Sequence, residues 1–201
     1  MQFRLVPDGV YARGGARTNQ AEARAVVAEV SRRLQAMADG AAEKSIGIVT
    51  FNAQQQALID DLLDAAQRDN PVLERFFGDS VTEPVLVRNL ENVQGEELDV
   101  MIFSLTYGPD ASGKVTVNFG PLNQNGGERR RNVAITHARE ALVVFGSLSP
   151  DRIDLSRTTA IGVQDLRQFL EFAEKGAQVL AAGPSVSEGD FESPFEEAVA
   201  Q

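Results

Sequence analysis

The sequence predicts an α/β fold in which helices cover both faces of a mainly parallel β-sheet. Short and almost wholly apolar runs, of the kind buried in parallel sheets, alternate with longer segments whose apolar residues recur at helical spacing. The chain of 201 residues, 43% of them apolar, can also bury one sizeable core but hardly two. We therefore expect one three-layer sandwich with short appendages.

The N-terminal segment predicts an edge strand, a loop and a first helix. Residues 3–6 form a short apolar run, and the stretch 11–18 after it, with two adjacent glycines, is typical of a loop. Asn19 and Glu22 have the spacing of a capping box, in which each side chain accepts from the other residue's backbone N–H. Apolar residues at helical spacing then predict a surface helix that ends at residues 39–40.

The middle of the chain predicts three strands and two helices. Residues 45–51 and 84–89 are β-rich, and residues 100–107 are nearly all apolar, as expected of a central strand. Asn52 can cap a helix directly after the first of these strands, which makes a βα unit. Residues 70–79, with a proline near the start, predict a short helix.

The C-terminal half predicts one further strand between two helices. In the connector rich in glycine, proline and asparagine, residues 114–118 could form one arm of a small hairpin. A helix over residues 127–140 and a strand over residues 141–145 are expected next. An amphipathic helix over residues 163–173 closes the domain, and an acidic tail begins near residue 183.

Composition bounds the compartment and the partners. The chain has no cysteine and one histidine, which excludes disulfides, thiolate metal sites and histidine-rich metal sites. No apolar run approaches the roughly 20 residues of a membrane span, and a basic-then-apolar leader is missing, so we expect a cytoplasmic protein without a membrane partner. Half of the net charge of −10 lies in residues 188–201, which carry five carboxylates and no basic residue.

Polar residues gather at the ends of expected strands and helices, where a doubly wound sheet usually keeps its ligands. Arginines at 129–131, with Arg139 further on, could receive an anion at a helix N-terminus or could merely be solvated. Glu97 could accept hydrogen bonds from a ribose or cap a turn. Gln54 and Gln55 could offer amide groups to a ligand or form a polar helix start. The pattern G-x-x-x-x-G-K-[ST] is absent, so a triphosphate cradle would need a partner surface.

Three segments in order resemble motifs IV, V and VI of superfamily 1 helicases. They are residues 50–56, 89–99 and 130–139, and they are similar to the branch whose motifs read Q-G-x-E-x-D and N-V-A-x-T-R-A-R. The resemblance covers residues 19–147. It implies a RecA-like domain of the P-loop NTPase type that lacks its own Walker A sequence and is the second of two such domains in a DNA or RNA helicase.

The resemblance also implies a role for each matching residue. Cations that would approach the γ-phosphate of ATP are Arg130, His137 and Arg139. Positions that would bind the nucleotide are Gln54, Gln55, Gly95 and Glu97. Positions that would contact the nucleic-acid strand are Asn52, Val93 and Gln94. ATP with Mg²⁺ would be the cofactor, and both would need the first RecA-like domain, because the phosphate cradle and the metal ligands belong there.

One position departs from the family pattern. His137 stands where the family has the arginine that contacts the phosphate, and neutral imidazole offers one donor instead of a permanent bidentate cation. Three explanations remain open: Arg139 or Arg130 takes over, His137 acts when protonated, or hydrolysis is weakened. We expect reduced but not abolished ATP turnover in the full enzyme.

These observations predict three segments: a strand and loop over residues 1–18, the second RecA-like helicase domain over 19–180, and an acidic tail over 181–201. Residues 192–199 resemble the opening helix of a Vsr-like endonuclease domain, and a disordered acidic terminus is the alternative. The leading function is the second motor domain of an ATP-dependent helicase or translocase that acts on nucleic acid, DNA in preference to RNA. Its partner is the first RecA-like domain, and the chain alone is expected to be inactive.

Two other functions compete with the motor domain. A degenerate, non-catalytic helicase-like domain could serve as a module that binds nucleic acid or protein, in keeping with His137. An unrelated Rossmann-like binding domain has less support, because no G-x-G-x-x-G follows an expected strand. A Walker-type lysine in a preceding domain would distinguish a motor from a module.

Overall fold

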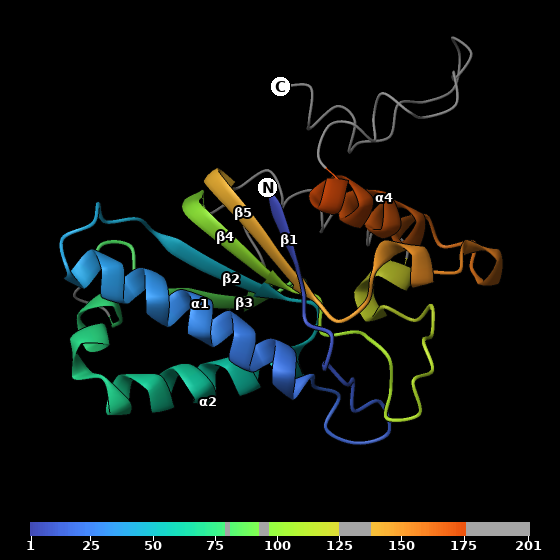
Figure 1. The fold of residues 1–201 in the computed structure, drawn as a ribbon, viewed down its shortest axis with the longest axis horizontal. Coiled ribbons are helices and arrows are strands. Elements are labelled where there is room, and N and C mark those ends of the chain that lie inside the picture. Colours follow the sequence, from blue (N-terminus) through green and yellow to red (C-terminus); the bar gives the residue numbers. More distant parts are fainter. Residues whose placement is uncertain (79–80, 93–96, 125–137, 176–201) are drawn as a thin grey trace, which may run out of the picture.

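A five-stranded parallel sheet forms the centre of the protein (Figure 1). The computed structural model describes residues 1–78, 81–92, 97–124 and 138–175, and within these ranges the strand order is β1-β5-β4-β2-β3. The strands are β1 (Gln2–Leu5), β2 (Ile46–Thr50), β3 (Leu86–Asn89), β4 (Leu98–Ser104) and β5 (Ala138–Gly146). The central pair β4 and β5 runs in parallel register, with Ile102 opposite Val143. All five predicted strands are therefore present.

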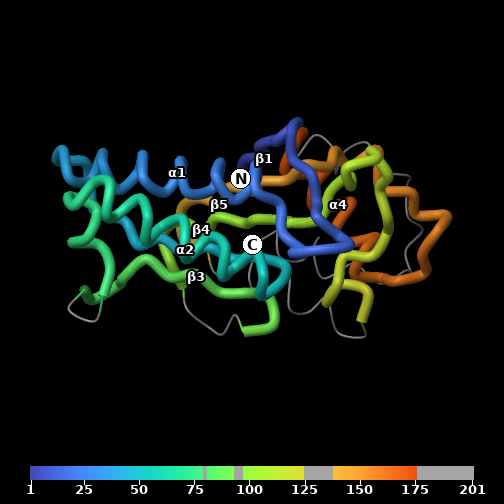
Figure 2. Tube along the Cα trace, turned by 90° about the horizontal axis from the view of Figure 1, so that it is seen from below, coloured from blue at the N-terminus to red at the C-terminus, as the bar shows by residue number. Residues whose placement is uncertain are grey.

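Helices cover both faces of this sheet. The helices α1 (Gln20–Ala38) and α2 (Ala53–Asp69) lie side by side on one face, and α4 (Ile161–Lys175) lies on the other (Figures 1 and 2). Two buried apolar clusters separate the layers, one between the sheet and α1 with α2, and one between the sheet and α4. The predicted α/β three-layer sandwich of RecA-like type, with a mainly parallel sheet, is confirmed.

Short 3-10 helices connect the main elements. They are η1 (Pro71–Phe76), η2 (Gly120–Asn123), η3 (Pro150–Arg152) and η4 (Leu155–Arg157). The short helix predicted after α2 is η1, where the Asn70 side chain accepts a hydrogen bond from the backbone N–H of Val72. In the described part of the chain, no helix is long and apolar enough to cross a membrane.

Asparagine side chains fix the starts of α1 and α2. The Oδ1 atom of Asn19 accepts a hydrogen bond from the backbone N–H of Glu22 at 3.2 Å, and that of Asn52 accepts from the N–H of Gln55 at 2.8 Å. Each bond satisfies a donor that a helix start otherwise leaves unpaired. Both predicted caps are confirmed, although the Glu22 carboxylate turns away from Asn19 N–H, so the capping box is only half formed.

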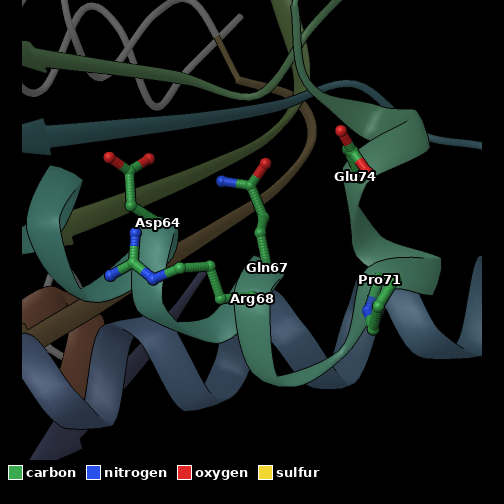
Figure 3. A pocket seen from close by; sticks show the side chains of 5 residues that line it. All are labelled: Asp64, Gln67, Arg68, Pro71 and Glu74. Atoms are coloured by element: carbon green, nitrogen blue, oxygen red, sulfur yellow. The ribbon is translucent and has the colours of Figure 1, made fainter.

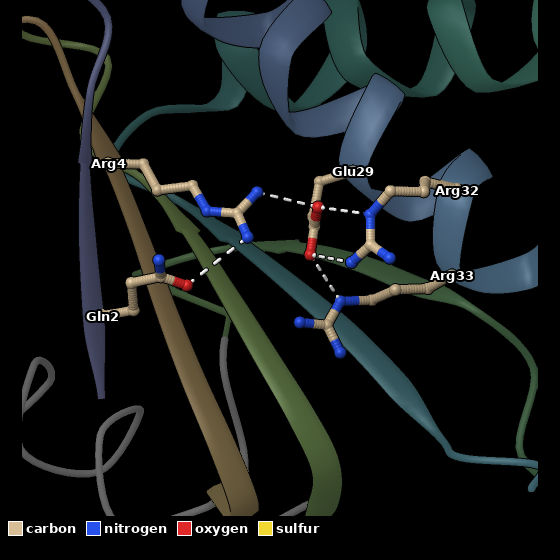
Figure 4. Close-up of polar contacts among 5 residues, drawn as sticks. All are labelled: Gln2, Arg4, Glu29, Arg32 and Arg33. Carbon is tan, nitrogen blue, oxygen red and sulfur yellow. Dashed lines mark hydrogen bonds and ion pairs between the residues drawn. The ribbon is translucent and has the colours of Figure 1, made fainter.

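An arginine cluster ties the edge strand β1 to α1 (Figure 4). The Glu29 side chain, 3% exposed, accepts from Arg4 Nη1 of β1 at 2.7 Å. It also accepts from Arg32 Nη2 at 2.9 Å and Arg33 Nε at 2.7 Å, both on α1. A buried carboxylate is tolerated only with such partners, so the cluster fixes how β1 sits against the helix.

Residues 114–118 do not form the predicted hairpin. They contain no strand, because side chains take the hydrogen bonds that a second strand would supply. Asn123 Nδ2 donates to the carbonyl of Val117 at 2.8 Å, and Asn123 Oδ1 accepts from Phe119 N–H at 2.6 Å. Local amide bonds of this kind favour turns over strands.

The helix predicted for residues 127–140 is wrong at its end. Residues 138–140 belong to β5, which begins at Ala138 instead of residue 141 and pairs there with Leu98 of β4. The pairing explains the error, since a neighbouring strand that itself starts earlier than predicted offers these residues backbone partners. Residues 125–137, and the tail over 181–201, lie outside the described residues.

Candidate functional site

Two of the predicted site residues lie at the carboxyl edge of the sheet, where α2 begins. Asn52 caps α2 and also donates from Nδ2 to the carbonyl oxygen of Arg17 at 3.1 Å. Its side chain interacts with the Tyr107 hydroxyl, whose pKa burial raises. Gln54, in the first turn of α2, is exposed. Asn52 and Gln54 therefore share one end of the domain.

Gln55, next to them, is fully buried. Its Oε1 accepts from the backbone N–H of Asn19 at 2.8 Å. Its Nε2 donates to the carbonyl oxygen of Asn19 at 3.1 Å and to Ser104 Oγ at 3.1 Å. Both ends of the Gln55 amide thus bind within the domain and join the starts of α1 and α2.

A buried carboxylate that sequence reasoning missed lies beside Gln55. The Oε1 atom of Glu22 accepts from Ser104 Oγ at 2.7 Å and from the N–H of Thr106 at 2.5 Å, and its Oε2 accepts from Ser147 Oγ at 3.2 Å. Burial raises the pKa of Glu22 to about 7, against these hydrogen bonds, which lower it. Sequence reasoning missed these buried contacts because the spacing of Glu22 from Asn19 indicated a helix cap.

A small cavity of about 240 Å³ opens at the same edge. Aromatic, cationic and neutral polar side chains line it: Tyr11, Arg13, Arg17, Tyr107, Thr116 and Asn118. Sequence reasoning treated residues 11–18 only as a loop. The signal that could have indicated a site is the pair of arginines around two glycines after a tyrosine.

The other described site residues, Glu97 and Arg139, lie at the amino edge. Glu97 directly precedes β4, and Arg139 is the second residue of β5. Arg139 Nε lies 3.8 Å from Glu97 Oε2, and Arg139 Nη1 lies 3.6 Å from Asp99 Oδ1 and 3.7 Å from Glu83 Oε1. The Arg139 side chain is 45% exposed and the Glu97 side chain 65%. Three carboxylates thus lie around the accessible guanidinium of Arg139.

Asp99 is the least exposed member of this amino-edge cluster. Its Oδ2 accepts from the backbone N–H of Ser45 at 2.9 Å and from Ser45 Oγ at 3.1 Å. The backbone bond is the main reason that the pKa of Asp99 is lowered. Lys44, Ser45, Glu83 and Asp99 also line a cavity of about 310 Å³. The cluster therefore has a fixed base and space beside it.

The structure brings the predicted residues together in two groups and not in one. In a parallel sheet the starts of the strands lie at one edge and their ends at the opposite edge. The two edges are separated by the length of β4, which has seven residues. At roughly 3.3 Å per residue, this length is about 23 Å. Asn52, Gln54 and Gln55 belong to one edge, and Glu97 and Arg139 to the other. The remaining predicted residues lie outside the described residues: Val93, Gln94, Gly95, Arg130 and His137.

A third hollow, of about 320 Å³, lies between the end of α2 and η1 (Figure 3). Asp64, Gln67, Arg68, Pro71 and Glu74 line it. It contains none of the residues that the sequence singled out. In the described ranges, moreover, no group of three or more histidine, aspartate or glutamate side chains could hold a metal ion.

Comparison with known proteins supports a helicase relationship. A family model described as an AAA domain matches residues 8–149. The chain is 34% identical over 140 residues to a Mycoplasma genitalium protein named "Uncharacterized ATP-dependent helicase MG140", covering 68% of this chain and 12% of that protein. It is 32% identical over 174 residues to the Mycoplasma pneumoniae homolog of that helicase, covering 84% and 14%. The chain thus spans about one eighth of the length of these relatives.

Proposed function

The chain belongs to this AAA-domain family, and from that premise we propose that it is the second motor domain of an ATP-dependent superfamily 1 helicase or translocase. Its similarity to segments of two proteins named as ATP-dependent helicases supports this proposal. The observation that carries it is the meeting of Glu97 and Arg139 at one exposed edge. These residues match two different motifs, and a split ATP site needs both on one surface.

In this proposal the amino edge faces the nucleotide. ATP would supply the phosphoryl group for hydrolysis, and it requires a cradle and a Mg²⁺ site from a first RecA-like domain, because this sequence has no Walker A pattern. Glu97 and Gly95 are assigned to the nucleotide. Arg139, with Arg130 and His137, is assigned to the γ-phosphate, where a cation supplied across a cleft stabilises transferring charge.

The environment of Arg139 suits a cation that changes partners. Its contacts to Glu83, Glu97 and Asp99 span 3.6–3.8 Å, longer than close charge-assisted hydrogen bonds. The three carboxylates keep the guanidinium in place and would repel a phosphate. A nucleotide held by the first domain would therefore have to draw Arg139 away from them. Exposed ion pairs are weak enough for such an exchange.

The carboxyl edge is assigned to nucleic acid, with DNA as the expected substrate in preference to RNA. Asn52 represents motif IV there. The resemblance assigns Val93 and Gln94 to the nucleic-acid strand as well. Gln54 and Gln55 were expected at the nucleotide, but they lie on this edge, away from Glu97. We therefore propose instead that Gln54 lies beside the nucleic-acid strand and that Gln55 has a positioning role through its buried bonds. A cytoplasmic location and a nuclease segment starting within the tail remain part of the proposal.

A second candidate function is a non-catalytic module that binds nucleic acid or protein. One observation favours it: His137 replaces the arginine on which the motif VI chemistry depends. The module would need the same folded domain but no ATP turnover.

Nucleic-acid-stimulated ATPase rates of the longer protein that carries the first domain distinguish the two. Arg139→Ala should lower kcat at least tenfold, because a transition-state cation is lost. Arg68→Ala, which removes an exposed arginine at the end of α2, should leave kcat within twofold.

His137→Arg in the same protein should raise the single-turnover rate, because it restores the missing cation. An ATPase unaffected by both Arg139→Ala and His137→Arg would overturn the assigned phosphate contacts. A longer protein without any ATPase would favour the module.

A further inference from the structure

The loop of residues 11–18 is closed and ordered by its own backbone. Tyr11 and Asn19 pair as an isolated antiparallel bridge, and the N–H of Ala12 donates to the carbonyl of Thr18 at 2.9 Å. The N–H of Arg17 donates to the carbonyl of Ala12 at 2.9 Å. Arg17 has a φ of 59°, a left-handed conformation that costs free energy in a non-glycine residue. The fold therefore maintains a strained loop that holds two arginines.

Two nitrogens of the half-buried Arg13 side chain, Nε and Nη2, are buried and have no hydrogen-bond partner among the residues that the structure describes. Asp110 interacts electrostatically with Arg13, but its Oδ1 accepts from Ser112 N–H at 2.9 Å and from Lys114 N–H at 3.1 Å, and these bonds organise its own turn. A buried, unpaired charged donor is destabilising. The cost is explained if an acceptor from outside the chain completes the site.

Cationic and neutral side chains line the cavity beside Arg13. Besides the two arginines, the lining offers the hydroxyls of Tyr107 and Thr116 and the amide of Asn118, and none of its described residues is a carboxylate. Gly120, at φ 58°, closes the wall, where an added Cβ would overlap the Tyr107 hydroxyl. This chemistry fits an oxyanion, and the cavity of about 240 Å³ holds a phosphate group with ease.

We propose that this Arg13 pocket binds a backbone phosphate of single-stranded nucleic acid. The inference rests on the proposed function and adds a site that the three motifs do not contain. Asn52, the motif IV residue assigned to nucleic acid, borders the pocket through the Arg17 carbonyl and the Tyr107 hydroxyl. A phosphodiester is favoured over a free nucleotide phosphate because the assigned nucleotide edge is the opposite edge of the sheet.

The test uses residues 1–201 and a fluorescein-labelled oligothymidine of about 12 nucleotides in an anisotropy titration. Arg13→Met keeps much of the apolar stem and removes the unpaired charge. We expect at least tenfold weaker binding and a salt slope reduced by about one, as for the loss of one phosphate contact. The thermal midpoint should be unchanged or higher, because the variant no longer buries an unsatisfied cation.

Matched variants separate a ligand site from a structural role. Arg68→Met should bind within twofold of the wild type, because that exposed arginine lies at the end of α2. Thr116→Val on the pocket wall should weaken binding about threefold. A lower thermal midpoint in Arg13→Met, together with normal binding by Thr116→Val, would make Arg13 structural and overturn the proposal.

Three further results would also overturn it. Equal affinities of Arg13→Met and Arg68→Met would remove the pocket from nucleic-acid binding and leave the motor function to the ATPase test. Arg13-dependent binding of inorganic pyrophosphate, with oligonucleotide binding unaffected, would make it a small-anion site. Absence of oligonucleotide binding by the wild-type chain would reject the pocket, and a normal stimulated ATPase of the longer protein would then show that the motor function stands without it.

Discussion

At the residue scale, the Glu22 carboxylate contributes to the dependence of stability on pH. It is fully buried where α1 begins, among donors from the ends of β4 and β5. Burial raises its pKa from the ordinary value of 4.5 to about 7, although hydrogen bonds from Ser104, Thr106 and Ser147 lower it. Between these two pH values the folded state binds more protons than the unfolded state. Stability contributed by this group therefore falls as pH rises from 4.5 to 7.

Glu22→Gln should flatten that part of the stability curve. The full shift corresponds to roughly 3 kcal/mol between pH 4.5 and 7, which the neutral amide cannot contribute. Urea unfolding at pH 5 and pH 7.5 measures the difference. Glu174→Gln, at an exposed position of α4, should keep the wild-type slope. A wild-type protein equally stable at both pH values would contradict the prediction.

Glu29 acts in a separate pH window, so it does not confuse this measurement. Burial by itself would raise its pKa, but hydrogen bonds from Arg32, Arg4 and Arg33 lower the pKa to about 2. A group with a lowered folded pKa stabilises the protein above its unfolded value and loses that contribution as pH falls. Its effect is therefore confined to acid below about pH 4.5.

Sequence reasoning found residues whose partners are close in the sequence and missed residues whose partners are distant. Asn19 and Asn52 were predictable because a cap acts on backbone three residues away. Glu22 has the same local pattern, yet its partners Ser104 and Ser147 are more than eighty residues distant. Arg13 has a local signal, the two arginines around two glycines, but this signal does not reveal that two of its nitrogens lie unpaired among the described residues of a folded cavity. Local signals could not predict either environment.

At the element scale, α4 packs closely against η2 through a glycine. Gly162 lies in its first turn, and an added Cβ there would overlap the backbone carbonyl oxygen of Leu122 in η2. The neighbouring Phe169 and Leu166 are buried against the sheet in the same cluster. A backbone atom cannot swing away as a side chain can, so η2 or α4 would have to shift.

Gly162→Ala should therefore cost about 1–3 kcal/mol through overpacking. Alanine favours a helix over glycine by roughly 1 kcal/mol, so the expected net destabilisation is up to about 2 kcal/mol. Midpoints of urea unfolding measure it. Gly14→Ala is the control, because nothing lies within 4 Å of a Cβ at that position. A Gly162→Ala variant as stable as this control would show that η2 adapts without cost.

Element positions were predictable where one local signal decided them. Apolar runs located the five strands, and polar caps with glycine located the helix ends. The boundary between the expected helix and the strand, at residues 137–141, could not be predicted. Ala138 belongs to β5 because β4 begins at Leu98, early enough for Leu98 to pair with Ala138. The same pairing moves Arg139 from an expected helix to a strand at the amino edge. The position of Arg139 in the candidate site therefore differs from the prediction, because the sequence does not reveal the register in which β4 and β5 pair.

At the scale of the whole molecule, the sheet places two candidate surfaces at opposite ends of its strands. Arg139 contacts Glu83, Glu97 and Asp99 at the amino edge, whereas the cavity beside Arg13 opens near Asn52 at the carboxyl edge. Strands fix this distance, since the central β4 and β5 are hydrogen-bonded along their length. A motor built on this domain would have to transmit ATP binding by moving the domain as a body.

A double-mutant cycle with Arg13→Met and Arg139→Ala tests this separation. In the chain alone, the effects on oligonucleotide binding should add within about 0.5 kcal/mol, because the sites share no partner. In the longer protein, a non-hydrolysable ATP analogue should change the oligonucleotide affinity of the wild type, and Arg139→Ala should remove that change. Coupling then requires the first domain, as reciprocal linkage between two ligands demands a shared conformational equilibrium. Strong non-additivity in the isolated chain would instead mean that the two edges communicate within this one sheet.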